Sequence, residues 1–441
     1  MKKSNVILSV VLILLVLIGW GSQFLNIAKT NAQYNAYLQQ ANQYSEAGLY
    51  QKAIQSYEDA FQIKDNKAAR ELWIENYEKA FSDKAVTLNA YVAALQTMCD
   101  LYEKEASYWE QLIALQINNE QLDNAHDTFV DFKKTGLSSS VVDGFENQII
   151  YQFRVNRKPY LEVVRNSTGY YTVRDSQGWG IVRPNGETVY NCVYQYISPY
   201  NSNYDALFIS EKGQRIADAK AVVQAKINIE YKKTGAWVNG LLPVCDLNDN
   251  WYYLNCNNNE KAHGDYSYAS NYSAGIAAVC KGNEWYLVDT DGKNINNRKF
   301  SDIKLHGNGD YEYAGIMIAA VNGEYGIYDS KGELISDLHA KDMDVYMGEA
   351  IAYCDKATGK WGMVTRTGET VIKPTYEEAK SFSNNLAAVR NGEMWGFIIP
   401  AGELVIGYQF FDADYFTNGG LCAVSTAENK YVFIQLKYIE Q

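Results

Sequence analysis

Residues 386–398 read LAAVRNGEMWGFI, and this stretch decides the fold of the C-terminal part of the chain. A short apolar run is followed by a polar turn, an aromatic residue beside glycine, and a second apolar run. Residues 319–329 (AAVNGEYGIYD) and 277–289 (AAVCKGNEWYLVD) repeat the same order. Short apolar runs separated by glycine-containing turns are typical of antiparallel strands. The pattern therefore predicts an all-β repeat domain.

One aromatic residue recurs in this frame at intervals of 34 to 40 residues, with a single gap of 72. These aromatic anchors are Trp179, Trp251, Trp285, Tyr325, Trp361, Trp395 and Tyr431. The gap of 72 residues equals two intervals of 36, and residues 213–218 stand where the missing anchor would be. The spacing predicts about eight units of about 36 residues over residues 160–441.

A glycine stands seven residues after five of the anchors. These glycines are Gly186, Gly292, Gly332, Gly368 and Gly402. Each lies between apolar, β-branched runs, where a two-residue hairpin turn needs a positive φ that glycine adopts without strain. We expect each unit to be a three-stranded meander, followed by a linking segment such as residues 373–379 (KPTYEEA).

The units resemble the WG repeat family, also called KWG repeats. Residues 179–180, 360–362 and 395–396 match the Trp-Gly signature, whereas residues 251–252 and 285–286 have tyrosine in place of glycine. The resemblance implies a repeat module, mostly bacterial, without an assigned chemistry. Such units form either a closed propeller or an open β-solenoid. We expect propeller-like closure, because it protects the edge strands.

Residues 34–140 contain no proline and place apolar residues three and four positions apart, which predicts helices. The order of small and aromatic residues resembles a tetratricopeptide repeat (TPR). The residues that carry this resemblance are Tyr37, Ala41, Tyr44, Gly48, Tyr50, Ala53, Tyr57 and Ala60. It implies helix pairs that cross at Ala41 and Ala53, in about three units, with Asp65 where the family usually has proline. The alternative to TPR-like helix pairs is a plain helical bundle of the same length. We expect a linker over residues 141–160, between the helices and the β repeats.

The TPR resemblance also implies a peptide-binding face formed by the first helix of each pair. By this resemblance, the residues on or near the peptide-binding face are Leu38, Asn42, Ser45, Glu46, Glu78 and Glu110. By charge complementarity, the three glutamates favour a basic or amide-rich segment of a protein partner.

Residues 4–28 carry no charged side chain, and residues 6–18 (VILSVVLILLVLI) are almost wholly aliphatic. About 20 such residues span the hydrocarbon layer of a membrane. Lys2 and Lys3 precede the segment and only Lys29 follows it closely, so the positive-inside rule places the bulk of the chain outside the cytoplasm. We expect a single-pass anchor in the cell membrane. The alternative is a cleaved signal peptide, but residues 19–24 make a poor cleavage site.

Composition and motifs narrow the function classes. The net charge of −12 argues against binding to nucleic acid. The seven cysteines form no CxxC pair, and the four histidines are far apart in the sequence and form no HExxH pair. Cys245, Cys280 and Cys354 occupy the same place in their units, which indicates core residues. We therefore expect no enzyme activity, no cofactor and no metal site.

Two functions stay open. The first is a membrane-anchored scaffold at the cell envelope, which mediates protein–protein interactions through its TPR-like and WG repeats. The second is a carbohydrate-binding or cell-wall-binding protein that uses its tyrosine-rich β repeats, because aromatic faces stack on sugars. The candidate exposed tyrosines lie at residues 252–253, 266–272 and 311–313.

Overall fold

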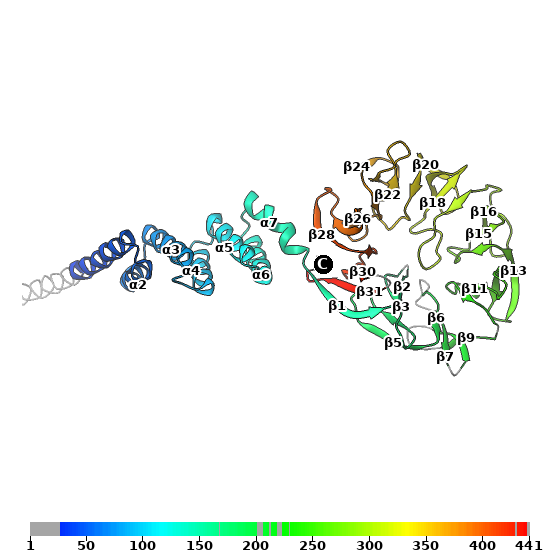
Figure 1. The fold of residues 1–441 in the computed structure, drawn as a ribbon, viewed down its shortest axis with the longest axis horizontal. Helices are drawn as coiled ribbons and strands as arrows, with labels where there is room; N and C mark the ends of the chain where they lie inside the picture. Colours follow the sequence, from blue (N-terminus) through cyan, green and yellow to red (C-terminus); the bar gives the residue numbers. More distant parts are fainter. Residues whose placement is uncertain are drawn as a thin grey trace, which may run out of the picture. The chain divides into compact units, whose positions relative to one another are not determined.

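The computed structural model divides the chain into two compact units, Met1–Ile150 and Tyr151–Gln441 (Figure 1). The structure describes residues 27–166, 168–200, 206–210, 213–217, 223–228, 230–427 and 430–438. The first unit is helical and the second is built of strands. Residues 4–26 of the expected membrane anchor lie outside the described residues. Among the helices that are described, none has the length and apolar character needed to cross a bilayer.

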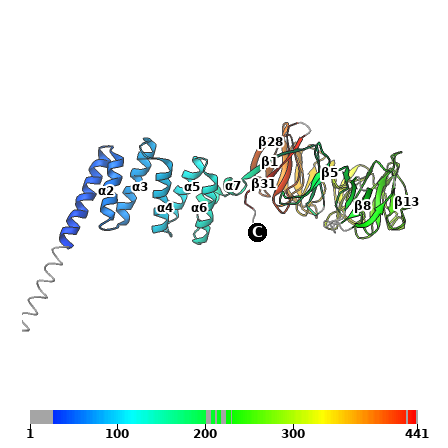
Figure 2. The ribbon, with the colours of Figure 1, turned by 90° about the horizontal axis from the view of Figure 1, so that it is seen from below.

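The first unit is a row of helices, as predicted for residues 34–140. Its helices span residues 27–46, α2 (Tyr50–Phe61), α3 (Lys67–Ser82), α4 (Leu88–Leu101), α5 (Ala106–Asn118), α6 (Leu122–Lys134) and α7 (Ser140–Ile150). From α2 to α7, each helix contacts the next along the chain (Figure 2).

Local sequence explains where these helices begin and pack. Gly48 has a φ of +72° and ends the first helix, and α2 begins at Tyr50. The side chain of Asn66 accepts a hydrogen bond from the backbone N–H of Ala69 and caps α3. Small side chains let the helix backbones approach closely. Five alanines of this unit are completely buried, at Ala41, Ala53, Ala60, Ala80 and Ala125.

Residues 141–160 are not a linker, which corrects the expectation from sequence. Most of α7 lies in this stretch, and Val142 and Ile149 are completely buried in the helical core. The rest forms β1 (Phe153–Tyr160), whose side chains between its two ends are all exposed. A strand exposed on both faces shows no apolar alternation, so its sequence could not be told from a linker.

The second unit is a β-propeller of eight blades, whose sheets follow one another around a ring (Figure 1). The first four blades are β2 (Glu162–Arg165), β3 (Tyr171–Arg174), β4 (Trp179–Val182) and β5 (Thr188–Tyr194); β6 (Tyr196–Ile197), β7 (Ala206–Ser210), β8 (Gly213–Ala217) and β9 (Val223–Ile227); β10 (Lys233–Thr234), β11 (Leu241–Cys245), β12 (Trp251–Asn255) and β13 (Glu260–Tyr266); and β14 (Tyr268–Ala269), β15 (Ala277–Lys281) and β16 (Glu284–Val288).

The other four blades complete the ring. They are β17 (Asp302–Ile303), β18 (Ile316–Val321), β19 (Glu324–Asp329) and β20 (Leu334–Ala340); β21 (Asp342–Met343), β22 (Ile351–Cys354), β23 (Trp361–Val364) and β24 (Thr370–Tyr376); β25 (Glu378–Ala379), β26 (Ala387–Asn391), β27 (Met394–Ile398) and β28 (Leu404–Phe410); and β29 (Asp412–Ala413), β30 (Leu421–Ala427), β31 (Lys430–Leu436) and β1.

Blade 8 closes the ring with strands from both ends of the β unit. β1 pairs antiparallel with β31, so that Phe153 faces Leu436 and Val155 faces Ile434. This pairing covers the edge that an open array would leave exposed. The expectation of propeller-like closure is confirmed, and the open solenoid is excluded.

The first strand of each blade lies at the axis, and in blades 2 to 8 this strand has only two residues. It comes from the linking segments. Residues 373–379, for example, supply the end of β24 and all of β25. Each blade therefore has a strand beyond the expected meander of three, except that blade 4 replaces its outer strand with isolated bridges such as Trp285 to Phe300.

The aromatic anchors stand at or next to the start of the third strand of their blades. Each lies opposite a residue of the outer segment, in the pairs Trp179–Tyr194, Trp251–Tyr266, Trp285–Phe300, Tyr325–Ala340, Trp361–Tyr376, Trp395–Phe410 and Tyr431–Tyr160. Trp251 and Trp395 are buried, and the other five anchors are half-buried. In blade 2 the position is held by Gln214, opposite Ile227.

The repeat glycines follow the third strand in hairpin loops of three residues, one more than expected. In blade 5 the N–H of Gly332 donates to the carbonyl of Asp329 at 3.0 Å, and the N–H of Asp329 donates to Glu333 at 2.9 Å. Such a loop places a left-handed residue at its third position. The φ values are +86° at Gly186, +77° at Gly292, +84° at Gly332, +90° at Gly368 and +83° at Gly402.

Candidate functional site on the propeller axis

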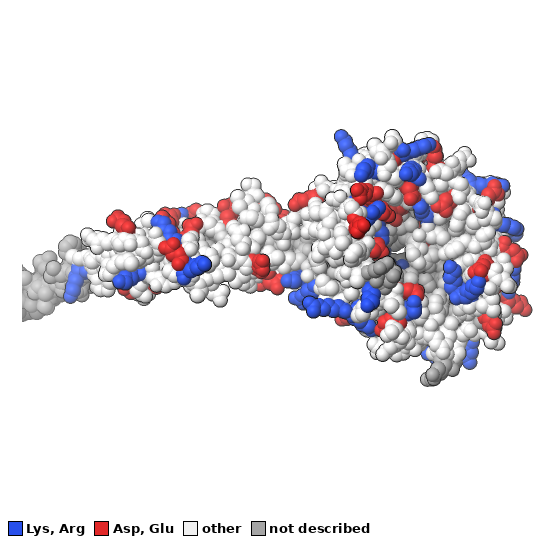
Figure 3. Space-filling view, in the orientation of Figure 1, with Lys and Arg blue, Asp and Glu red and all other residues white. Residues whose placement is uncertain are grey.

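Acidic and basic side chains are interspersed over the visible face of the propeller, without one large patch of either sign (Figure 3). The axis is different, because one repeat position brings side chains from all the blades together. This position is the residue that directly follows the innermost strand in blades 2 to 8, and Val164, opposite Thr172, in blade 1. Around the ring it is held by Val164, Ser198, Gly235, Ser270, Lys304, Asp344, Lys380 and Asp414. Charges of alternating sign thus occupy this position in blades 5 to 8, and Arg165 of blade 1 comes one residue after it.

A loop of blade 5, residues 304–315, lines two cavities at the axis. The side chain of Asn271 in blade 4 holds this loop, because its Nδ2 donates to the carbonyl of Asn308 at 2.9 Å and to Asp310 at 2.8 Å. The Oδ1 of Asn271 accepts from the N–H of Ala236 in blade 3 at 2.7 Å. One buried amide therefore ties three blades together and fixes the loop.

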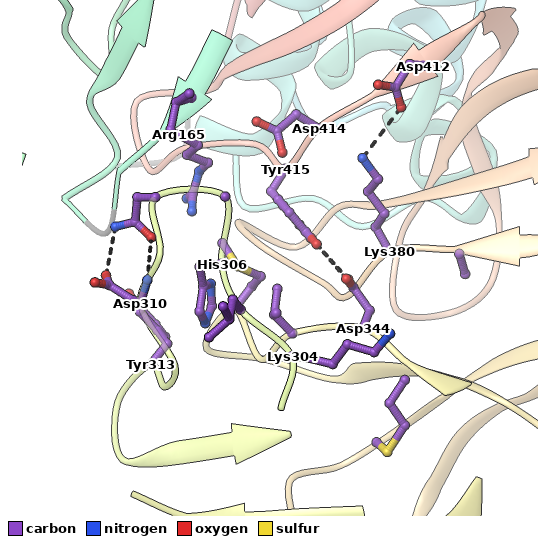
Figure 4. Close-up of a pocket in the computed structure, with 18 of the residues that line it drawn as sticks. Arg165, Lys304, His306, Asp310, Tyr313, Asp344, Lys380, Asp412, Asp414 and Tyr415 are labelled. Carbon is purple, nitrogen blue, oxygen red and sulfur yellow. Dashed lines mark hydrogen bonds and ion pairs between the residues drawn. The ribbon is translucent and has the colours of Figure 1, made fainter. Parts of the chain in front are cut away.

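The first cavity, which we call the charged cavity, has a volume of about 450 Å³. It is lined by residues 163–166, 304–308, 342–345, 378–380 and 412–415 in the main. Two of its cations are paired with a carboxylate of the following blade. Lys304 Nζ lies 2.8 Å from Asp342. Lys380 Nζ lies 3.6 Å from Asp412, the pair that Figure 4 shows.

Asp344 accepts hydrogen bonds without a charged partner. The hydroxyl of Tyr415 donates to its two carboxylate oxygens at 2.7 and 2.8 Å, and the N–H of Ser381 donates at 2.6 Å (Figure 4). Burial raises the pKa of Asp344 despite these bonds. Burial also raises the pKa of Asp414, and the nearby Lys380 and Arg165 only partly oppose it. Neither carboxylate has a cation within ion-pair distance in the described part of the chain.

Arg165 points into the same cavity beside the blade 5 loop (Figure 4). Its Nε is buried and has no hydrogen-bond partner among the described residues, and its guanidinium carbon lies 6.0 Å from the Tyr415 ring. Burial, together with the charge of Arg165, lowers the pKa of His306 to about 4. The imidazole of His306 is therefore neutral at pH 7. Asp414 interacts with Arg165 at longer range, but among the described residues no carboxylate lies within ion-pair distance of its guanidinium.

The second cavity, which we call the aromatic cavity, has a volume of about 430 Å³ and lies against blades 1 to 4. Two ring pairs line it: Trp179 and Tyr196 with centroids 5.5 Å apart, and Trp251 and Tyr268 with centroids 4.6 Å apart. Thr234 is 6% exposed, and within the described chain its hydroxyl has no hydrogen-bond partner. This lining offers aromatic faces and a hydroxyl, together with the charged side chains of Glu162, Lys232 and Lys233.

The residues proposed for peptide binding lie in three helices of the first unit, on residues 27–46, α3 and α5. Glu46 and Glu78 are exposed, and Ser45 is half-buried. Asn42 accepts a hydrogen bond from the Tyr57 hydroxyl at 2.5 Å. Two further members also contact the chain itself: Leu38 packs against the helical core, and Glu110 accepts from Ser139 at 2.6 Å.

The tyrosines proposed as exposed contacts divide between core and cavities. Tyr253 and Tyr311 are completely or almost completely buried, and their hydroxyls donate to backbone carbonyls of Ser270 and Ser330. Tyr268 lines the aromatic cavity, and residue 313 lines the charged cavity. The seven cysteines are buried and unpaired, including the three at equivalent repeat positions.

Sequence reasoning missed the charges at the axis, although a signal for them exists. In six of the eight blades an aromatic residue stands two positions after the axial one, at Tyr200, Trp237, Tyr272, Tyr346, Phe382 and Phe416. Alignment on this aromatic would have placed Asp344, Lys380 and Asp414 at one level of the ring. The insertion in blade 5 hides Lys304 from the same alignment.

One comparison with known proteins, against family models, matches segments of the β unit. The family described as "WG containing repeat" matches residues 179–208, 253–285 and 361–395. No curated protein matches the chain. Among solved structures, the chain is similar to BamB from Moraxella catarrhalis, with 11% identity, a TM-score of 0.41, and 62% of this chain and 96% of that one covered.

Two further solved structures are similar to the chain. The computationally designed Ika8 protein has 9% identity and a TM-score of 0.40, with 65% of this chain and 99% of that one covered. Hsv2p from Kluyveromyces lactis has 10% identity and a TM-score of 0.36, with 54% of this chain and 92% of that one covered. The segments that match the WG-repeat family lie in blades 1 to 4, 6 and 7. The chain thus carries WG repeats, and its β unit is an eight-bladed β-propeller.

Proposed function

We propose that this chain is a non-enzymatic, membrane-anchored scaffold at the cell envelope, which binds protein partners through TPR-like helices and the WG-repeat propeller. The observation that carries the proposal is the pair of cavities on the propeller axis, where side chains of different blades converge. Convergent polar and aromatic side chains in a concave site are the usual mark of ligand binding. A rigid closed ring is well suited to hold such a site in one geometry.

The anchor is the uncharged segment over residues 4–28, with Lys2 and Lys3 on its cytoplasmic side. In this arrangement the helices and the propeller lie outside the cytoplasm. Protease added to cells stripped of their wall should digest everything beyond about residue 30. If the propeller is fully protected, and is digested only after lysis, this topology is wrong.

The TPR-like helices supply the first binding surface in this proposal. Support comes from the order of the helices, each packed on the next, and from the buried alanines at Ala41 and Ala53. The proposed face carries the exposed carboxylates of Glu46 and Glu78, which favour a basic segment of the partner. A row of so few helices gives a small interface, so we expect a Kd that is roughly micromolar or weaker.

Glycan binding is the second candidate function, and the aromatic cavity favours it. Its two ring pairs and the unpartnered hydroxyl of Thr234 offer stacking faces and a hydrogen-bonding group. Sugars use both kinds of contact, because their rings have apolar faces and polar edges. In this alternative the propeller holds cell-wall glycan, and the helices act only as a spacer.

Crosslinking in intact cells, followed by pull-down of the full chain, separates the two functions. Glu78→Lys should greatly reduce capture of a protein partner, because it reverses one charge of the proposed face. Asp127→Lys is the matched control, since this carboxylate of α6 is 83% exposed and lies outside that face. If both variants capture the same proteins, and Tyr268→Ala instead releases the chain from isolated wall, the glycan function replaces the scaffold.

A further inference from the structure

Within the described chain, the charged cavity contains one cation and two carboxylates that have no partner at ion-pair distance. Lys304 and Lys380 are paired with Asp342 and Asp412 across neighbouring blades. Asp310 accepts a hydrogen bond from Asn271, and Glu378 is paired with Arg390. The three groups left are the guanidinium of Arg165 and the carboxylates at positions 344 and 414, of which Asp414 interacts with Arg165 and Lys380 only at longer range. A ring that served only to hold the blades together would pair these groups directly, because an unpaired buried charge is costly.

We propose that the charged cavity binds a free amino acid, with the ligand carboxylate on Arg165 and the ligand ammonium group on Asp344 and Asp414. This inference rests on the proposed role of the axis as a binding site and names its ligand class. The contacts use the strongest polar geometry available to each group. A guanidinium donates two parallel hydrogen bonds to a carboxylate, and an ammonium donates three to oxygen acceptors.

The charge balance of the lining argues against the simpler ligands. Three cations and six carboxylates line the cavity: Arg165, Lys304 and Lys380 against Asp310, Asp342, Asp344, Glu378, Asp412 and Asp414. Glu378 is neutralised by Arg390 from outside the lining, which leaves five carboxylates for the three cations. An anion alone would meet a surplus of negative charge. A cation alone would leave the buried Nε of Arg165 without a partner. A zwitterion offers a carboxylate to Arg165 and an ammonium group to Asp344 and Asp414 at the same time.

The cavity also has room and apolar surface for the ligand's side chain. Its volume of about 450 Å³ lies within the range of small-molecule sites. Val163, Leu305, Val345 and Met347 line it together with the charged groups. Because carboxylates outnumber cations, we expect basic amino acids to bind most tightly, neutral ones less tightly, and acidic ones least.

The test is isothermal titration calorimetry, in which L-lysine, L-leucine and L-glutamate are each titrated into the full chain in detergent. The tightest of these is then compared with its amide, which lacks the carboxylate, and with its Nα-acetyl derivative, which lacks the α-ammonium group. We expect each analogue to bind about ten-fold more weakly or worse, because each removes one set of charge-assisted hydrogen bonds. The expected order among the amino acids is lysine, leucine, glutamate.

Variants assign the binding to the cavity. Arg165→Gln and Asp344→Asn should each weaken binding by about ten-fold or more, and the asparagine keeps an acceptor for the Tyr415 hydroxyl. Arg183→Gln is the matched control, since this arginine pairs with Glu187 in an exposed hairpin loop. Thermal unfolding shows that each variant is folded, and Arg165→Lys, which keeps the charge, should retain part of the affinity.

Three results would overturn the inference: no heat of binding at millimolar amino acid, analogues as tight as the parent, or unchanged affinity in folded Arg165→Gln. Tight binding of the acetyl derivative alone would make the cavity an anion site. Tight binding of the amide alone would make it a site for cationic side chains. The helical binding surface of the proposed scaffold does not depend on these outcomes, because Glu78→Lys tests it separately.

Discussion

Blade 7 and blade 2 have the same strand order, although only blade 7 carries the repeat signature. In blade 7, Trp395 is 5% exposed and lies opposite Phe410, which is 2% exposed. In blade 2 the same position holds Gln214, opposite Ile227. Both blades nonetheless form four strands in sequence. The aromatic anchor therefore adds packing to a blade and is not what creates it.

What the two blades share lies in their middle strands. Leu207 and Ile216 of blade 2 are completely buried, as is Phe397 of blade 7, and Ala387 is 1% exposed. These side chains pack between neighbouring sheets, where burial of apolar surface stabilises the ring as a whole. A blade that lacks its anchor is held by this packing and by its two neighbours.

Replacement of the anchors should give the largest difference between the blades. Trp395→Ala should lower the free energy of unfolding by about 3–5 kcal/mol, because it leaves a cavity in a closed core. Gln214→Ala should change it by about 0.5 kcal/mol or less, as expected for a site without a packed aromatic. Chemical denaturation of the full chain measures both, and equal losses would show that the anchor position matters irrespective of its side chain.

The stability lost on replacing an anchor should also depend on how deeply that anchor is buried. Trp361 is half-buried and lines the charged cavity, whereas Trp395 is buried in its core. Trp361→Ala should therefore cost less than Trp395→Ala, about 1–3 kcal/mol. The same denaturation experiment compares them. A larger loss for Trp361 would contradict the burial of these two side chains in the structure.

The hairpin glycines give a comparison within one repeat position. Gly368 and Gly402 have φ values of +90° and +83°, so valine is strained at both. A Cβ at Gly368 would overlap the hydroxyl of Ser336 in blade 5, whereas at Gly402 the nearest atom lies 3.9 Å away. Gly368→Val should therefore destabilise by about 1–3 kcal/mol more than Gly402→Val. Equal unfolding midpoints would show that backbone strain alone acts at this position.

A further expected effect is a pH dependence at the axis, where His306 and the buried carboxylates act in opposite directions. The pKa of His306 is about 4 in the folded chain, below its ordinary value of 6.5, so the unfolded chain binds more protons between these values. The contribution of His306 to stability is present above pH 6.5 and is lost as the pH falls through 4. Asp344 and Asp414, whose pKa values are raised, act in the opposite direction.

The test for His306 is therefore a difference between two profiles. Unfolding of the wild type and of His306→Gln is measured from pH 7 to pH 4. The wild type should lose more stability than the variant over this range, since glutamine does not titrate. Parallel profiles would mean that the imidazole is not held neutral by its surroundings.

Much of the propeller could be predicted from sequence, because its middle strands repeat a strong local pattern. The anchors and glycines predict eight units, and blade 2 is predicted by the length of its gap. β1 could not be predicted, since a strand exposed on both faces has no apolar alternation. The two-residue strands at the axis are too short to leave a periodic signal.

The candidate site depends on contacts that no local pattern contains. Tyr415 of blade 8 reaches across blade 7 to Asp344 of blade 6, a separation of 71 residues. Arg165 joins the same cavity only because β1 closes the ring beside blade 8. Sequence periodicity predicts which residues share a repeat position. It does not predict that those positions meet at an axis and leave charges unpaired there.

The central claim is that five blades jointly form one binding site on the axis of a closed ring. Hydrogen exchange of the full chain, with and without saturating L-lysine, tests it most directly. We expect slower exchange in residues 163–166, 304–313, 342–347, 378–380 and 412–415 together, with the outer strands unchanged. Protection confined to the helices or to a single blade, or no protection at all, would contradict it.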